Sequence, residues 1–189
     1  MANRSSYHHG DLRRSVLKAA AEVIAESGPD ALSLRDLARR AGVSHAAPAH
    51  HFGDRAGLLT ALAVEGHQLL AADLGAAGDL REMGMRYVRF AADHPAHFKV
   101  MFRPDLVRPD NPELTLAQAL TAERLRAGVA SLPQTDTTDP RMTGIAAWSL
   151  AHGFATLLLS GSLTDPVGAQ DAVDYFGRLA EATFGGKQS

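Results

Sequence analysis

The sequence contains no cysteine, and this absence excludes several classes of site. Without a thiol there is no disulfide framework, no thiolate zinc site and no cysteine nucleophile. The N-terminal stretch MANRSSYHHGDLRR lacks an apolar core, so it does not resemble a secretory signal. The sequence also shows no internal repeat and no low-complexity segment. Together these features predict a cytoplasmic protein.

A strong net charge is also missing, because the 189 residues carry a formal charge of only −2. The length suits one large domain or two small ones. Residues 1–60 hold eight Lys or Arg against six Asp or Glu, a balance of +2, and the other 129 residues hold eleven against fifteen, a balance of −4. The sign of this mild asymmetry fits DNA binding at the N-terminal end, and chance is the competing explanation.

The motifs of common enzymes and metal sites are absent as well. The sequence has no Gly-rich phosphate loop and no G-x-S-x-G nucleophile elbow. Among nine histidines, His94 and His97 could bind a metal together with Asp93, but Pro95 between them breaks regular helical geometry. We therefore expect no catalytic residue, no metal and no cofactor.

Residues 33–52 carry the most informative pattern in the chain. Apolar residues recur there at helical spacing, at Leu34, Leu37, Ala38 and Ala41. Ser33 is a suitable N-cap for this first helix, and Gly42 stands where the chain needs a tight turn with a positive φ. Ser44 is the candidate N-cap of a second helix that starts at about His45. A helix, a Gly-containing turn and a second helix form the helix-turn-helix pattern.

The second helix of this pattern has few large apolar side chains before Phe52. A helix with so small a face contributes little to a core and suits close approach to another molecule. Arginines flank it, at Arg39, Arg40 and Arg55. The residues alone leave two interpretations open, a DNA-binding helix-turn-helix and an ordinary corner between two helices.

Hydrophobic periodicity predicts helices along the rest of the chain and thus an all-α fold. The expected helices cover residues 11–27, 54–74, 79–92, 113–131 and 140–164, and a last helix starts at Asp165–Pro166. The run 142–164 has no charged residue and is long enough to span a bilayer. Its polar residues and glycines favour instead a helix that is buried in a core or in an oligomer interface.

The segment AHHFGDRAGL, from Ala49 to Leu58, is similar to a phrase of the TetR family of transcriptional regulators. The family pattern is Tyr-x-His-Phe-x-x-Lys-x-x-Leu, and His51, Phe52, Arg55 and Leu58 match it in kind. Ala49 departs from it, because the family usually has a phosphate-contacting aromatic residue there. The resemblance extends over residues 10–70.

A second resemblance concerns Trp148, His152 and Gly153, which fit the Trp-His-Gly signature of the C-terminal domain in one TetR subgroup. Trp148 and His152 are one helical turn apart and therefore share a face. They are interpreted either as part of a ligand pocket or as a packed aromatic beside a hydrogen-bonded core histidine.

Residues 1–9 are polar and are expected to form a flexible arm. The resemblance implies a helix-turn-helix DNA-binding domain over 10–56 and a helical ligand-binding and dimerisation domain over 57–189. The implied function is a ligand-responsive regulator, expected to be a repressor, which binds a roughly palindromic operator as a homodimer. The alternatives are a small-molecule-binding helical protein without DNA binding, which Ala49 keeps open, and a helical enzyme.

Three sets of site residues follow. By the resemblance, DNA contacts come from Arg35, Ser44, His45, Ala46, Ala47, His50, His51 and Arg55. The aromatic and methionine content of the middle helices predicts a mainly apolar ligand site at Met83, Tyr87, Phe90, Phe98, Met101, Phe102, Trp148 and His152. The dimer interface is expected at Leu158, Val173, Phe176 and Leu179. The expected partners are operator DNA, a largely hydrophobic effector and a second copy of the chain, with no membrane.

Overall fold

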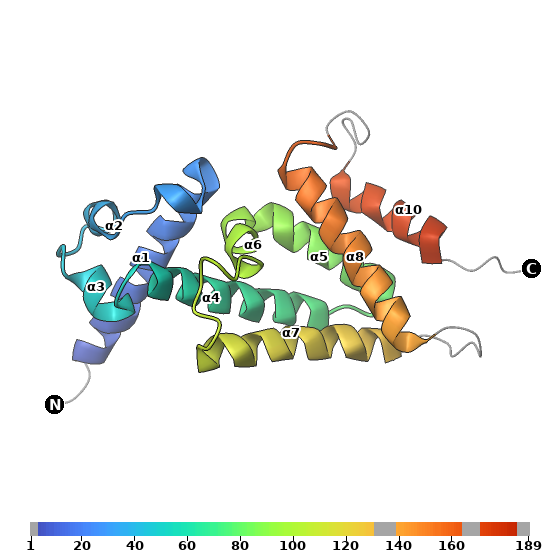
Figure 1. The fold of residues 1–189 in the computed structure, drawn as a ribbon, viewed down its shortest axis with the longest axis horizontal. Helices are drawn as coiled ribbons and strands as arrows, with labels where there is room; N and C mark the ends of the chain where they lie inside the picture. Colours follow the sequence, from blue (N-terminus) through green and yellow to red (C-terminus); the bar gives the residue numbers. More distant parts are fainter. Residues whose placement is uncertain (1–3, 131–138, 164–170, 185–189) are drawn as a thin grey trace, which may run out of the picture. The chain divides into compact units, whose positions relative to one another are not determined.

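The computed structural model describes residues 4–130, 139–163 and 171–184, and within these ranges every regular element is a helix (Figure 1). This confirms the all-α class. The helices are α1 (Arg4–Ser27), the short 3₁₀ helix η1 (Pro29–Ala31), α2 (Leu34–Arg40), α3 (Ala47–Phe52), α4 (Arg55–Gly75), α5 (Leu80–Asp93), α6 (Pro95–Met101), α7 (Pro112–Ala130), α8 (Pro140–Leu159) and α10 (Ala172–Phe184).

The chain forms two compact units. Unit 1 contains residues 1–67 and 96–116, and unit 2 contains residues 68–95 and 117–189. This division differs from the boundary expected at residue 56, because the first half of α4 and all of α6 after its first residue pack within unit 1. The sequence pattern could not reveal this, since α6 joins unit 1 through contacts that are distant along the chain.

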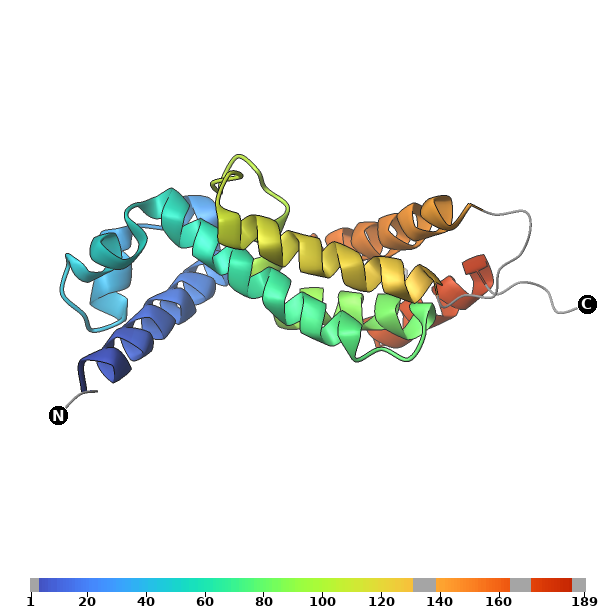
Figure 2. The same cartoon turned by 90° about the horizontal axis from the view of Figure 1, so that it is seen from below.

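In unit 1, α1 packs against α2 and α3 (Figures 1 and 2). Val16, Ala20 and Ile24 on α1 are fully buried, as their helical spacing predicts. The helix begins at Arg4, so residues 4–9, which were expected to form a flexible arm, continue α1 instead. Extending an existing helix fixes one residue for each added hydrogen bond, which is far easier than nucleating a new helix. Residues 1–3 of the expected arm lie outside the described residues.

The turn between α2 and α3 has the predicted chemistry at its start. Ser33 caps α2, and its hydroxyl oxygen accepts the N–H of Asp36 at 3.5 Å. Gly42 has a φ of 66°, a conformation that glycine adopts without a steric cost.

The start of α3 differs from the prediction, because Ser44 does not cap it. The helix begins at Ala47, and the N–H of Ala47 donates to the Ser44 carbonyl at 3.0 Å in a turn. Pro48 explains the shift, since proline has no N–H to donate to the carbonyl four residues earlier. Residues 45 and 46 therefore belong to the turn and not to the helix.

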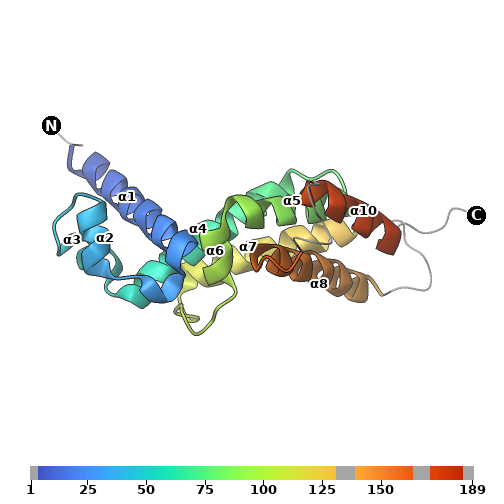
Figure 3. The same cartoon turned by 90° about the horizontal axis from the view of Figure 1, so that it is seen from above.

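In unit 2, α5 packs against both α8 and α10, and these two helices also contact each other (Figure 3). Asp79 caps α5 as predicted, accepting the N–H of Glu82 at 2.6 Å. Phe176 lies in the core of the unit and is only 2% exposed. A Cβ atom on Gly84 would lie 2.7 Å from its ring, so the missing side chain of this glycine lets α10 approach α5 closely.

Two of the residues predicted for the dimer interface are therefore core residues of one subunit. Val173 is 6% exposed and Phe176 is 2% exposed, whereas Leu158 and Leu179 are half-buried. The amphipathic pattern of α10 correctly indicated a buried face. It did not distinguish burial within a subunit from burial between subunits, because both need the same apolar spacing.

Helix α8 begins as predicted, with Pro140 in its first turn and Asp139 accepting the N–H of Arg141 at 2.9 Å. Within the described ranges, α8 meets the length and composition of a membrane-spanning helix, and only 17% of its apolar window is buried. Its exposed large apolar residues are Met142, Ile145, Trp148 and Leu157. Most of the uncharged run thus lies outside the core of unit 2. The helix start expected at Asp165–Pro166 lies outside the described residues.

Candidate DNA and ligand sites

Helix α3 presents one buried and one exposed face. Pro48 and Phe52 are buried against unit 1, and Arg13 lies over the Phe52 ring at 5.9 Å from its centroid. Of the predicted contact residues, Ser44, His45, Ala46 and His50 are exposed, and Ala47 and His51 are half-buried. Ala49 is also exposed, close to His45 and Ala46 in sequence, and was not predicted as a contact.

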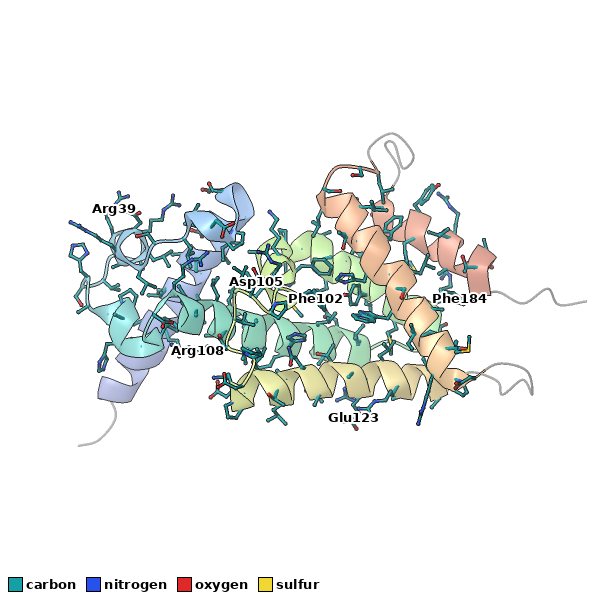
Figure 4. The ribbon with its side chains drawn as sticks, in the orientation of Figure 1. Arg39, Phe102, Asp105, Arg108, Glu123 and Phe184 are labelled. Atoms are coloured by element: carbon teal, nitrogen blue, oxygen red, sulfur yellow. The ribbon has the colours of Figure 1, made fainter. Side chains whose placement is uncertain are left out.

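The basic residues near α3 differ in their surroundings. Arg35 is exposed in the first turn of α2. Arg39, labelled in Figure 4, lies 3.6 Å from the Asp36 carboxylate, and Arg40 lies 3.7 Å from that of Glu26. Exposed ion pairs of this length are weak, so both guanidinium groups can turn toward a phosphate at little cost.

Arg55 makes two bonds within unit 1 that were not predicted. Its guanidinium donates to the Pro29 carbonyl at 2.8 Å and to the Asp30 carboxylate at 3.3 Å. These bonds tie the start of α4 to η1, the connection between α1 and α2. Arg55 therefore links parts of unit 1, and its phosphate contact stays a prediction. A bond across 26 positions of sequence leaves no local signal.

In unit 2, Tyr87, His152 and Trp148 form a contiguous group. The Tyr87 hydroxyl lies 2.8 Å from Nδ1 of His152, and the Trp148 ring lies 5.8 Å from the His152 ring. Burial raises the pKa of the Tyr87 hydroxyl and lowers the pKa of His152, so both side chains are neutral at pH 7. Tyr87 is 5% exposed and Trp148 is 44% exposed, so the group extends from the core of the unit to its surface.

The other predicted ligand residues fall into both units. Met83 and Phe90 are buried in unit 2, where the Met83 side chain fills the space beside Gly128. Phe98, Met101 and Phe102 belong to unit 1. The structure thus divides the predicted ligand residues into one group in unit 2 and another group in unit 1.

His67 belongs to the group in unit 1 and was not predicted. Its ring lies 6.0 Å from that of Phe102, which is itself 5.2 Å from the Phe98 ring (Phe102 is labelled in Figure 4). Burial lowers the pKa of His67 to about 4, although a hydrogen bond with the Met101 backbone acts in the opposite direction. A neutral histidine in an apolar setting has no sequence motif, so only the structure reveals it.

The metal hypothesis gains no support from the geometry. Across the residues that the structure describes, no three His, Asp or Glu side chains are arranged to hold a metal ion. His97 interacts instead with Glu65 on α4, at 3.3 Å between Nε2 and Oε2.

Two family profiles match the sequence. Residues 16–62 match the bacterial regulatory proteins of the tetR family, and residues 80–183 match the tetracyclin repressor-like C-terminal domain. The second match alone spans more than half of the chain. The chain belongs to the TetR family. Neither match tests the Trp-His-Gly resemblance of Trp148, His152 and Gly153, which stays a prediction.

Solved structures share the TetR fold with this chain. A protein of unknown function from Rhodococcus sp. RHA1 is 34% identical, with a TM-score of 0.74 over 94% of this chain and 95% of that one. PfmR of Thermus thermophilus, a TetR family transcriptional regulator, is 22% identical, with a TM-score of 0.67 over 92% and 99%. AibR, solved with isovaleryl coenzyme A and operator DNA, is 12% identical, with a TM-score of 0.66 over 88% and 94%. No curated protein matches significantly.

Family membership defines the general activity. This TetR-family protein is a DNA-binding transcriptional regulator that responds to a small-molecule effector and acts as a homodimer. The family is one of bacterial regulatory proteins.

Proposed function

We propose that this regulator reads its operator with the exposed face of α3 and the turn before it. The observation that carries this proposal is the composition of that face, where the exposed His45 and His50 accompany the small residues Ala46 and Ala49. Small side chains allow the backbone to come close to the floor of the major groove. Imidazole nitrogens can bond to base edges, and alanine methyl groups can contact the thymine methyl.

Phosphate contacts in this proposal come from arginines on α2. Arg35, Arg39 and Arg40 are exposed on the helix that precedes α3, and such contacts fix the register of a protein on DNA without reading sequence. Arg55 is left out because its guanidinium holds η1. The exposed Ala49 supplies no aromatic contact to phosphate.

We propose further that two copies associate through the exposed face of α8. Ile145 is 63% exposed and Leu157 is 47% exposed, and a soluble monomer seldom leaves such a row of large apolar residues in water. Gly153 lies between them, and a Cβ atom there would meet no atom within 4 Å. A partner helix can therefore approach α8 closely at this position. Leu158 and Leu179, which are half-buried, lie at the margin of this face in the proposal.

For the effector we propose a mainly apolar compound that is oriented by polar atoms of Tyr87 and His152. Both groups are neutral at pH 7 and lie in an apolar setting, which suits a ligand of low charge. The AibR ligand, an acyl coenzyme A, is a useful competing candidate because it combines an apolar chain with phosphates. Effector binding would favour a dimer that fits the operator poorly, so the effector would release the protein from DNA. In this proposal the protein acts as a repressor in the cytoplasm.

The experiment that tests DNA reading starts by selecting the operator of the wild-type protein from random duplexes. His45→Ala and His50→Ala should then each lose roughly tenfold or more of their preference at one or two base pairs. His94→Ala, a histidine of unit 2, is the matched control and should keep the wild-type preference. If both α3 variants select the wild-type sequence with the same stringency, α3 does not read the bases. If the wild-type protein enriches no duplex, the proposed reading of DNA by α3 fails as well.

A further inference from the structure

The segment between α6 and α7, residues 102–111, has a defined path within unit 1. Two turns shape it, in which the Leu106 N–H donates to the Arg103 carbonyl at 3.0 Å and the Asn111 N–H donates to the Arg108 carbonyl at 3.1 Å. Leu106 is only 7% exposed and anchors the segment in the unit. We call residues 102–111 the strap.

Arg108 in the strap makes two bonds to the beginning of α4. Its guanidinium donates to Asp54 Oδ2 at 2.8 Å, and its backbone N–H donates to the Thr60 hydroxyl oxygen at 2.9 Å. Asp54 Oδ1 caps α4 by accepting the Gly57 N–H at 2.8 Å, and Thr60 donates to the Ala56 carbonyl at 2.7 Å. One residue of the strap therefore holds both the cap and the second turn of α4.

These bonds lie beside the turn that joins α3 to α4. Gly53 forms this turn with a φ of 77°, and a Cβ atom on it would lie 3.8 Å from the Arg108 guanidinium. Helix α3 ends at Phe52 and Asp54 caps α4, so the direction of α3 relative to α4 depends on how Phe52 and Asp54 are held. Arg108 and Asp105 of the strap are labelled in Figure 4.

The charge of Asp54 also matters for DNA. The hydrogen bonds from Gly57 and Arg108 lower the pKa of Asp54, so its carboxyl group is ionised at pH 7. The Asp54 side chain is 62% exposed and lies two residues after the end of α3. An unpaired carboxylate there would repel DNA phosphates, and the guanidinium of Arg108 compensates this charge.

We propose that Arg108 is a positioning residue for operator recognition, which acts through Asp54 from a segment outside the helix-turn-helix. Arg108 fixes the α3–α4 turn in the geometry that reads DNA and neutralises the carboxylate beside it. The proposal rests on the proposed function of α3. It differs from a direct phosphate contact by Arg108, because the effect of Arg108 must depend on Asp54.

The test is a double-mutant cycle on the operator selected by the wild-type protein. Arg108→Gln should bind this duplex roughly 3- to 30-fold more weakly than wild type, the range for residues that act through a network. In the Asp54→Asn background the same change should have less than about a twofold effect, since its partner charge is already gone. In the Asp54→Asn background, where no carboxylate is left to repel phosphates, the slope of affinity against salt should be the same with Arg and with Gln at position 108, because positioning releases no counterion.

The strap supplies a matched control in Arg103. Its guanidinium pairs with Asp105 at 2.8 and 2.7 Å, within the strap itself. Arg103→Gln should therefore keep wild-type DNA affinity. Arg108→Lys, which retains the charge, should recover part of the affinity. The melting temperature of Arg108→Gln should stay within about 3 °C of wild type, since exposed ion pairs add little to global stability.

The possible outcomes separate the proposal from its competitors. Equal losses for Arg108→Gln in both backgrounds, with a reduced salt slope, would identify a phosphate contact and overturn the positioning role. Unchanged or tighter binding by Arg108→Gln would overturn it as well. Failure of the wild-type protein to bind any duplex would instead remove the proposed function on which the inference rests.

Discussion

Acidification should destabilise unit 1 through His67. The structure holds this side chain at 5% exposure, and burial lowers its pKa from the ordinary 6.5 to about 4. Below pH 6.5 the unfolded chain therefore binds a proton that the folded chain cannot accept until the pH approaches 4. Stability from this residue is complete above pH 6.5 and is lost as the pH falls.

The size of the effect follows from the two pKa values. Between pH 7 and pH 5, linkage gives a loss of about 2 kcal/mol in the free energy of unfolding for a shift from 6.5 to about 4. His152, whose pKa burial also lowers, adds to the loss with the same sign. The variant His67→Leu binds no proton at this position. Its unfolding free energy should therefore fall by about 2 kcal/mol less than that of wild type between pH 7 and pH 5.

Urea unfolding at pH 7 and at pH 5 measures the difference for wild type and for His67→Leu. Both proteins are compared at one fixed concentration, because dimerisation makes the apparent stability depend on concentration. Only the change in unfolding free energy between pH 7 and pH 5 is compared, so any effect of the leucine on packing, which is the same at both pH values, cancels. If the variant and the wild type lose the same free energy between pH 7 and pH 5, the reasoning from His67 burial is refuted.

Two further predictions concern unit 2. Ile145→Asp on the exposed face of α8 should sediment as a folded monomer, and a dimeric variant would contradict the proposed interface. Phe176→Ala should instead lower the free energy of unfolding, measured in urea, by about 3–5 kcal/mol, because it leaves a cavity in the core. Tyr87→Phe should weaken an effector that releases wild-type protein from DNA by roughly 3- to 10-fold while DNA affinity without effector stays the same; an unaltered effector response would exclude the Tyr87 hydroxyl from the site.

Local chemistry was the part of the fold that the sequence predicted well. The caps at Ser33, Asp79 and Asp139 and the positive φ at Gly42 all follow from interactions within a few residues. The helix-turn-helix and the family could be predicted for the same reason, since their pattern is contiguous. Helix α3 begins two residues after the predicted start because Pro48 has no N–H to donate to the Ser44 carbonyl.

Long-range relations were the part that could not be predicted. Arg55 matches a family position in kind, but its bonds to Pro29 and Asp30 depend on how the α1–α2 connection folds back. Phe176 has the spacing of an interface residue, and only the close approach of α10 to Gly84 shows that it belongs to the core. The link from Arg108 to Asp54 joins residues 54 positions apart, and neither residue belongs to a motif that indicates the other.

The division of the chain has a consequence for exchanging parts between relatives. Transplanting residues 1–56 onto another TetR-family body would leave behind α6 and the strap, which belong to unit 1. The donor segment would then meet a foreign residue where Arg108 bonds Asp54. If Arg108 positions α3 as proposed, a chimaera that keeps its DNA specificity needs residues 96–116 together with the N-terminal segment, and the transferable part is then discontinuous in sequence.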